Sequence, residues 1–144
     1  FAVALSMANK HKKEVAIALG MHAGDDAIYP DCRPESIEAV TKAFMVSNWN
    51  SKSVVYLSPY LEMNKTSILR QCLIDCEFLD LDFNTILQST STTYSPTKEG
   101  LSEGKSSSDI ERIEAFINIG REDPAEYTKP WEEIVAHAKQ VLAQ

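Results

Sequence analysis

Two short apolar runs with a helical pattern between them constrain the fold of this chain more than any other feature. The run "EVAIALG" (14–20) is rich in β-branched residues and ends at a glycine, which is typical of a buried parallel strand. The run "SVVYLSPY" (53–60) has a similar character. Because parallel strands need a long, usually helical crossover, the pattern predicts an α/β protein with a doubly wound parallel sheet.

Helical patterns precede and separate the two runs. A helix is expected over "FAVALSMANKHK" (1–12), and another over "PESIEAVTKAFMVSNW" (34–49), whose initial proline suits the first helical position. In the second of these segments, Ile37, Val40 and Phe44 recur at helical spacing. They predict one apolar face that packs on the sheet.

The remainder of the chain is predicted to be helical except for one long loop. Asn64 is expected to cap a helix over "MNKTSILRQCLIDC" (63–76), and "LDFNTILQ" (81–88) is expected to form a shorter helix. The segment "STSTTYSPTKEGLSEGKSSS" (89–108) is too polar to bury and is predicted to be loop. The last helix is expected to begin at Pro130.

Ser108 and Glu111 have the spacing of a capping box, S-x-x-E, which predicts that another helix begins there. Gly120 is expected to end it. The apolar residues of this helix are predicted to face the core: Ile110, Ile113, Phe116 and Ile117.

Composition limits the class of protein. Of the 144 residues, 44% are apolar, which suffices for one domain with a core. The net charge of −7 disfavours a nucleic-acid partner, since such binding draws on Lys and Arg. We find no apolar run long enough for a membrane span and no signal peptide. The three cysteines make an odd number, so we expect reduced thiols and a cytoplasmic protein.

Cys72 and Cys76 lie four residues apart on a predicted helix. This spacing suits one side of a metal site, but the apolar neighbours Leu73, Ile74 and Phe78 favour a buried apolar face.

The segment "YPDCRPES" (29–36) concentrates polar side chains on a stiff piece of backbone. It follows the first predicted strand, and ligands of doubly wound folds lie at the carboxyl ends of strands. Fixed φ angles at Pro30 and Pro34 would hold the polar groups in place at a low ordering cost. Taken by itself, the segment is better explained by a proline-bounded turn with a salt-bridged arginine, because short motifs often have only a structural role.

Several segments, in order along the chain, resemble the 7-cyano-7-deazaguanine synthase family within the PP-loop ATP pyrophosphatase group. They are "GMHAGDDAIYPDCRPESIEA", "NKTSIL", "DIERIEAF" and "GREDPAEY". The resemblance implies an adenine nucleotide alpha-hydrolase-like fold, of which residues 1–89 would be the C-terminal part, with a substrate loop at 20–36. Residues 90–144 would hold a degenerate zinc site and C-terminal helices. Phe1 lies in an apolar helical pattern without a cap, so we expect the chain to begin within a domain.

The resemblance also implies a reaction. Enzymes of this family convert 7-carboxy-7-deazaguanine and ammonia into 7-cyano-7-deazaguanine with ATP and Mg²⁺, and a homodimer is expected. The family's Ser-Gly-Gly-x-Asp-Ser nucleotide loop is absent from these residues. We therefore expect no ATP-dependent turnover from these residues alone, and the sequence assigns no catalytic residue.

The resemblance places substrate-binding residues in the proline-rich loop. Arg33 would pair with the substrate carboxylate, and Asp31 or Glu35 would accept hydrogen bonds from the deazaguanine edge. Tyr29 would stack on the ring. Asp25 aligns with an acidic position of the family loop.

Lys65 and Thr66 stand at the start of a predicted helix, where free N–H groups favour anions. We expect them to contact phosphate; a solvated helix start is the alternative.

The family's four zinc-binding cysteines have no counterpart here. Their positions are occupied by Thr93, Glu103, Ser106 and Asp109. A closed structural zinc site needs a thiolate-rich tetrahedral donor set, so zinc is not expected.

Two alternatives remain. One is a non-catalytic module that keeps deazapurine binding or dimerisation but has lost the metal and nucleotide sites. The other is an ATP pyrophosphatase that acts on another carboxylate or on tRNA, which the specific loop and the acidic charge disfavour.

Overall fold

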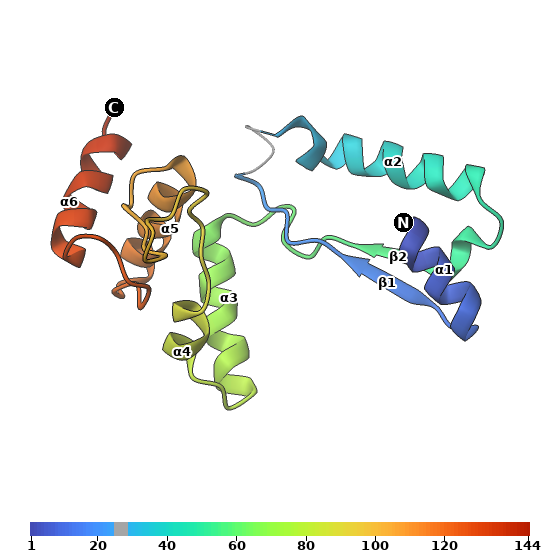
Figure 1. Ribbon diagram of the computed structural model, residues 1–144, viewed down its shortest axis with the longest axis horizontal. Helices are drawn as coiled ribbons and strands as arrows, with labels where there is room; N and C mark the ends of the chain where they lie inside the picture. Colours follow the sequence, from blue (N-terminus) through green and yellow to red (C-terminus); the bar gives the residue numbers. More distant parts are fainter. Residues whose placement is uncertain (25–28) are drawn as a thin grey trace. The chain divides into compact units, whose positions relative to one another are not determined.

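The computed structural model describes residues 1–24 and 29–144. The chain divides into two compact units, Phe1–Asn64 and Lys65–Gln144. Figure 1 colours both along the sequence. The family-derived boundary between residues 89 and 90 stays a prediction.

The first unit contains both predicted strands. β1 (Val15–Ala18) and β2 (Val54–Leu57) pair in parallel, with Val15 opposite Val54 and Ala18 opposite Leu57. The connection between them includes α2 (Pro34–Ser47), which begins at the predicted proline. The α/β class is therefore confirmed in the form of a two-stranded parallel sheet with helices.

α1 (Ala2–His11) and α2 contribute to one apolar cluster with the strands. The cluster contains Ala4, Ala8, Phe44 and Val54, and the ring of Phe1 lies 4.7 Å from that of Phe44. The apolar face predicted for α2 is narrower than expected. Phe44 is buried, whereas Val40 is 52% exposed and forms part of a cavity wall.

The second unit is helical. It contains α3 (Lys65–Phe78), α4 (Phe83–Gln88), α5 (Ser107–Ile119) and α6 (Trp131–Leu142). The segment between α4 and α5 is loop, as predicted, and a bridge joins Ser102 to Tyr127. α5 packs against both α3 and α6.

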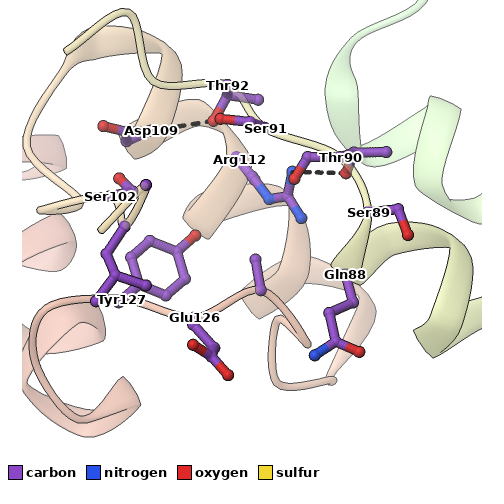
Figure 2. Close-up of a pocket in the computed structure, with 13 residues that line it drawn as sticks. Gln88, Ser89, Thr90, Ser91, Thr92, Ser102, Asp109, Arg112, Glu126 and Tyr127 are labelled. Carbon is purple, nitrogen blue, oxygen red and sulfur yellow. Dashed lines mark hydrogen bonds between the residues drawn. The ribbon is translucent and has the colours of Figure 1, made fainter. Parts of the chain in front are cut away.

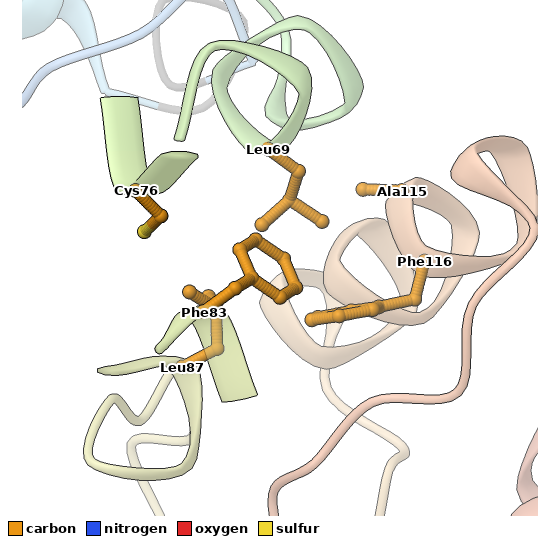
Figure 3. Close-up of a cluster of buried hydrophobic side chains, with 6 residues drawn as sticks. All are labelled: Leu69, Cys76, Phe83, Leu87, Ala115 and Phe116. Atoms are coloured by element: carbon orange, nitrogen blue, oxygen red, sulfur yellow. The ribbon is translucent and has the colours of Figure 1, made fainter. Parts of the chain in front are cut away.

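Aromatic and aliphatic side chains of three helices form the main core of the second unit (Figure 3). The rings of Phe83 and Phe116 meet edge to face with their centroids 6.4 Å apart. A second cluster joins α5 to α6 through Ile113 and Ile134. The core-facing residues predicted for α5 are confirmed, since three are buried and Ile117 packs against this cluster.

The buried face predicted for α3 is only partly correct. Cys76 is buried, but Ile74 and Phe78 are 59% and 86% exposed. Because an α-helix advances about 100° per residue, these two side chains fall on the side opposite Leu69 and Cys76, which contact the core.

The start of α5 differs from the predicted capping box. The cap is Ser106, whose Oγ accepts from the backbone N–H of Asp109 at 3.1 Å, while Asp109 accepts from the N–H of Ser106 at 3.3 Å. Glu111 is not available for capping because it binds Lys65 Nζ at 2.7 Å. Gly120, at φ +70°, ends the helix as predicted.

The two tryptophans have contrasting environments. Trp49 follows α2 in the first unit and is 97% exposed, whereas Trp131 packs against both apolar clusters of the second unit. Within residues 1–24 and 29–144, no helix is long and apolar enough to cross a bilayer.

The assignment of Ser106 as the N-cap of α5 can be tested directly. Ser106→Ala should lower the free energy of unfolding by about 1 kcal/mol, because an N-cap hydroxyl satisfies a helix N–H. Ser108→Ala is the matched control and should cost less than about 0.5 kcal/mol. Urea denaturation followed by circular dichroism measures both, and the reverse order would show that the cap is misplaced.

Candidate functional site

The first unit has a cavity beside α2 and the carboxyl end of β2. Its volume is about 720 Å³, and its wall includes Pro34, Thr41, Tyr56 and Ser58. An adjoining cavity of about 200 Å³ shares Thr41 and Tyr56 with it and also contacts Asp31. The two cavities therefore share part of their walls, near the carboxyl end of β2, where ligands of parallel α/β sheets bind.

Local backbone geometry explains how the proline-rich loop reaches this place. A short 3-10 turn, η1 (Pro30–Cys32), is closed by a hydrogen bond of 3.0 Å from the N–H of Cys32 to the carbonyl of Tyr29. Arg33 is then extended, at φ −71° and ψ 145°, as residues before a proline are. The chain enters α2 directly afterwards, so the loop leads into a wall of the cavity.

The structure brings one of the predicted loop residues to a cavity wall. Asp31 lines the smaller cavity. Tyr29, Arg33 and Glu35 are exposed and belong to neither of these two walls. Asp25 lies outside the described residues. Substrate binding by these residues stays a prediction.

Sequence reasoning did not single out three hydroxyl residues of the larger cavity, Thr41, Tyr56 and Ser58. Their side-chain oxygens are buried and have no hydrogen-bond partner among the residues that the structure describes. A signal was available only for Ser58, which follows the second predicted strand where a binding residue is expected.

Lys65 and Thr66, the predicted phosphate ligands, lie in the second unit at the start of α3. Lys65 Nζ donates to Glu111 at 2.7 Å and to the carbonyl of Ser108 at 3.3 Å. Thr66 accepts a hydrogen bond from Asn118 at 3.2 Å. These bonds tie α3 to α5, and phosphate contact stays a prediction.

The second unit has a pocket of about 270 Å³ whose wall is rich in hydroxyl groups (Figure 2). The wall is made by the end of α4, the long loop, α5 and the segment before α6. Its hydroxyl residues include Ser89, Thr90, Thr92, Ser102 and Tyr127.

The buried guanidinium of Arg112 forms part of the wall of this pocket. Arg112 donates from Nε and Nη2 to the two carboxylate oxygens of Asp123, at 2.5 and 2.9 Å. It also donates to Thr90 Oγ1 at 2.8 Å and to the carbonyl of Leu87 at 3.0 Å. Burial opposes the charge of Arg112, but the hydrogen bonds and negative charge of Asp123 outweigh it and raise the Arg112 pKa.

Asp123 accepts two further hydrogen bonds, from the phenol of Tyr127 at 2.8 Å and from the N–H of Ala125 at 2.9 Å. Burial and the negative charge of Asp123 raise the Tyr127 pKa far above its ordinary value. The segment "GREDPAEY" thus supplies a carboxylate that organises the backbone before α6.

Cys72 and Cys76 lie close together on α3, and Cys72 is poorly suited to nucleophilic chemistry. Their sulfur atoms are 3.9 Å apart. Burial, together with the hydrogen bond to Cys76, raises the pKa of Cys72 to about 11, so its thiol is neutral at physiological pH.

Comparison with known families identifies the chain's relatives. The family described as "Queuosine biosynthesis protein QueC" matches residues 1–120. The chain belongs to the QueC family. The resemblance seen in the sequence is therefore confirmed.

Relatives within the QueC family are 7-cyano-7-deazaguanine synthases. The chain is 37% identical over 108 residues to the enzyme of Marinomonas sp., covering 75% of this chain and 44% of that protein. It is 38% identical over 109 residues to the enzyme of Caldicellulosiruptor bescii, covering 75% and 43%. The chain thus spans less than half the length of these curated relatives. No solved structure matches it.

The residues at the positions predicted to align with the family's zinc ligands do not fit that metal. Both oxygens of Asp109 already accept hydrogen bonds, one from Thr92 at 3.1 Å and the other from Ser106 Oγ at 2.7 Å. Glu103 pairs with Lys105 at 2.8 Å, and Thr93 offers only a hydroxyl. Among the described residues, no group of three or more His, Cys, Asp or Glu is arranged to hold a metal.

The buried ion pair between Arg112 and Asp123 leads to a prediction about stability. Asp123→Asn should lower the free energy of unfolding by about 3–5 kcal/mol, because it leaves the Arg112 charge buried without its partner. Glu133→Gln, which removes an exposed ion pair with Lys129, should cost less than about 1 kcal/mol. Chemical denaturation measures both free energies of unfolding. Equal effects would show that losing the buried Asp123 pair costs no more than losing an exposed ion pair.

Metal removal tests the zinc positions. The purified protein should contain zinc far below one ion per chain, and an excess of EDTA should leave its unfolding midpoint unchanged. Elemental analysis and thermal denaturation provide the two readouts. Stoichiometric zinc would overturn the assignment.

Proposed function

We propose that this chain is the substrate-loop and C-terminal part of an enzyme that converts 7-carboxy-7-deazaguanine and ammonia into 7-cyano-7-deazaguanine. One observation carries the proposal: in a member of the QueC family, the "YPDCRPE" segment leads into the wall of a cavity at the carboxyl end of a parallel strand. The relatives' name supplies the product, and the family resemblance supplies the carboxylate and ammonia from which it would be made.

The loop chemistry suits this substrate. A guanidinium binds a carboxylate through two parallel hydrogen bonds, which is the role proposed for Arg33. Carboxylates such as Asp31 and Glu35 accept hydrogen bonds from the amino and lactam N–H groups of a deazaguanine. Asp25 would add to this acidic edge, and Tyr29 would stack on the ring.

Several finer features accompany the proposal. The parallel β1–β2 pair with its crossover helix would be part of a larger doubly wound sheet of the adenine nucleotide alpha-hydrolase type. The whole enzyme would use ATP and Mg²⁺ in the cytoplasm as a homodimer, with no nucleic-acid or membrane partner. The residues of this chain do not fit a complete nucleotide site, because the glycine-rich signature is absent and the Lys65 ammonium is paired with Glu111.

A second function is supported by the replaced zinc ligands. Because the thiolates are gone and Ser106 and Asp109 bond to each other, the chain also suits a non-catalytic module that retains deazapurine binding. Titration with ATP separates the two functions. If the protein is the enzyme, its full-length form must bind both ATP and 7-carboxy-7-deazaguanine. If it is the non-catalytic module, it binds only one of these two compounds or neither.

Calorimetric titration of 7-carboxy-7-deazaguanine tests the substrate assignment. Arg33→Ala should weaken binding by about 10- to 100-fold, since it removes a charge-assisted pair. Arg70→Ala, on the exposed side of α3, is the matched control and should leave affinity unchanged. Failure of the unmutated protein to bind, or equal binding by both variants, would refute the assignment.

A further inference from the structure

The end of α3 presents large apolar side chains to solvent. Ile74 and Phe78 stand one helical turn apart and are 59% and 86% exposed. Leu79 and Leu81, which follow the helix, are 58% and 50% exposed. Exposed apolar side chains that gather in one place commonly mark an interaction site. We call residues 74–82 the α3 surface.

Carboxylates surround the apolar side chains of the α3 surface. They belong to Asp75, Glu77, Asp80 and Asp82, and all of these residues are exposed. Residues 71–97 contain no Lys or Arg. The carboxyl end of a helix carries partial negative charge and favours cations nearby, yet the last turn of α3 has no basic residue. Cations from a partner would therefore stabilise this surface.

The first unit carries a surface of opposite charge near the amino ends of its strands. Trp49 is 97% exposed and Val46, in the last turn of α2, is 78% exposed. A hydrogen bond of 2.7 Å from Asn50 Nδ2 to Asn9 Oδ1 ties this turn to the end of α1 (Figure 1). The exposed lysines here are Lys10, Lys12, Lys13 and Lys52. We call residues 10–13 and 46–52 the Trp49 surface.

The two surfaces are complementary in charge and in apolar character. Residues 1–13 and 39–61 contain no Asp or Glu, so the Trp49 surface is as one-sided in charge as the α3 surface. Interfaces commonly bury aromatic anchors, while charges of opposite sign orient the partner. The α3 surface does not suit itself as a partner, because carboxylates would then face carboxylates.

The net charge of −7 opposes the approach of two copies of the chain. At physiological ionic strength, however, charges separated by more than about 8 Å are largely screened. The charges that meet within the contact therefore decide whether the two copies associate.

We propose that the α3 surface of one copy of this chain docks on the Trp49 surface of a second copy. Phe78 and Trp49 are the apolar anchors, and the lysines of one copy face the carboxylates of the other. When each copy uses both surfaces around a two-fold axis, the contact closes into a dimer. This inference rests on the homodimer that belongs to the proposed function, because it names the surfaces that form it, but it does not depend on the substrate.

Sedimentation velocity of the 144-residue chain over a range of concentrations tests the anchors. Trp49→Ala and Phe78→Ala should each weaken self-association by about tenfold or more, because truncating a central aromatic side chain removes much of the binding energy. Tyr94→Ala and Val3→Ala, at positions that are 79% and 75% exposed, are the matched controls and should leave it unchanged. Far-UV circular dichroism checks that all four variants fold.

Charge reversal tests whether two different surfaces meet. One variant carries Lys12→Glu with Lys13→Glu, and the other carries Asp75→Lys with Glu77→Lys. Each alone should associate about tenfold more weakly or less, since like charges then face each other. An equimolar mixture should regain the association of the unmutated chain, because opposite charges face each other again at both contacts. A contact of α3 with α3 would not show this recovery.

The outcomes separate this inference from the rest of the proposed function. If the unmutated chain stays monomeric at every concentration, the inference and the homodimer are both overturned, whereas the substrate assignment still depends on its own calorimetric titration. If the chain dimerises but the anchor variants associate as tightly as the unmutated chain, the homodimer stands and these surfaces do not form it. Failure of the mixed charge variants to recover also overturns the inference.

Discussion

The ion pair between Arg112 and Asp123 is the constraint on which the second unit depends. A buried charge is tolerated only when it is paired and its remaining donors are satisfied. Arg112 meets this condition by bonding to a carboxylate, a threonine side chain and a backbone carbonyl. Because these partners come from different segments, loops with little apolar content are held against α5. The apolar clusters on both sides of α5 then complete the packing.

Hydrogen bonds also fix the long loop where it enters α5. The positions aligned with zinc ligands carry their own hydrogen bonds, through Ser106, Asp109 and Thr92. A capping box of this kind stabilises by about 1 kcal/mol, far less than a structural zinc. Removing one partner of the buried Arg112–Asp123 pair costs more than losing this cap, because it leaves a buried charge unpaired.

Local signals predicted the elements of this fold well. Pro34 and Gly120 act through their own backbone preferences, so the start of α2 and the end of α5 were correct. The capping box was wrong by two residues because two S-x-x-acid frames overlap. The choice between them depends on Lys65, which binds Glu111 from 46 residues away. Similarly, the exposure of Phe78 follows from which side of α3 meets α4 and α5, and composition does not reveal this.

The candidate site was predictable only where a motif exists. The proline-rich loop can be recognised from its composition. Its place at a cavity wall follows from its position after the first predicted strand. The hydroxyls of Thr41 and Tyr56 carry no such signal, because threonine in a helix and tyrosine in a strand are ordinary residues. That their oxygens are buried without a partner among the described residues is visible only in the folded structure.

The placement of the two tryptophans has an optical consequence. Each unit holds one indole, and the chain contains no other. Trp49, which is 97% exposed, will fluoresce at long wavelength, while Trp131, partly buried against apolar groups, will emit further to the blue. The intrinsic emission spectrum therefore distinguishes events in one half of the chain from events in the other without an attached dye.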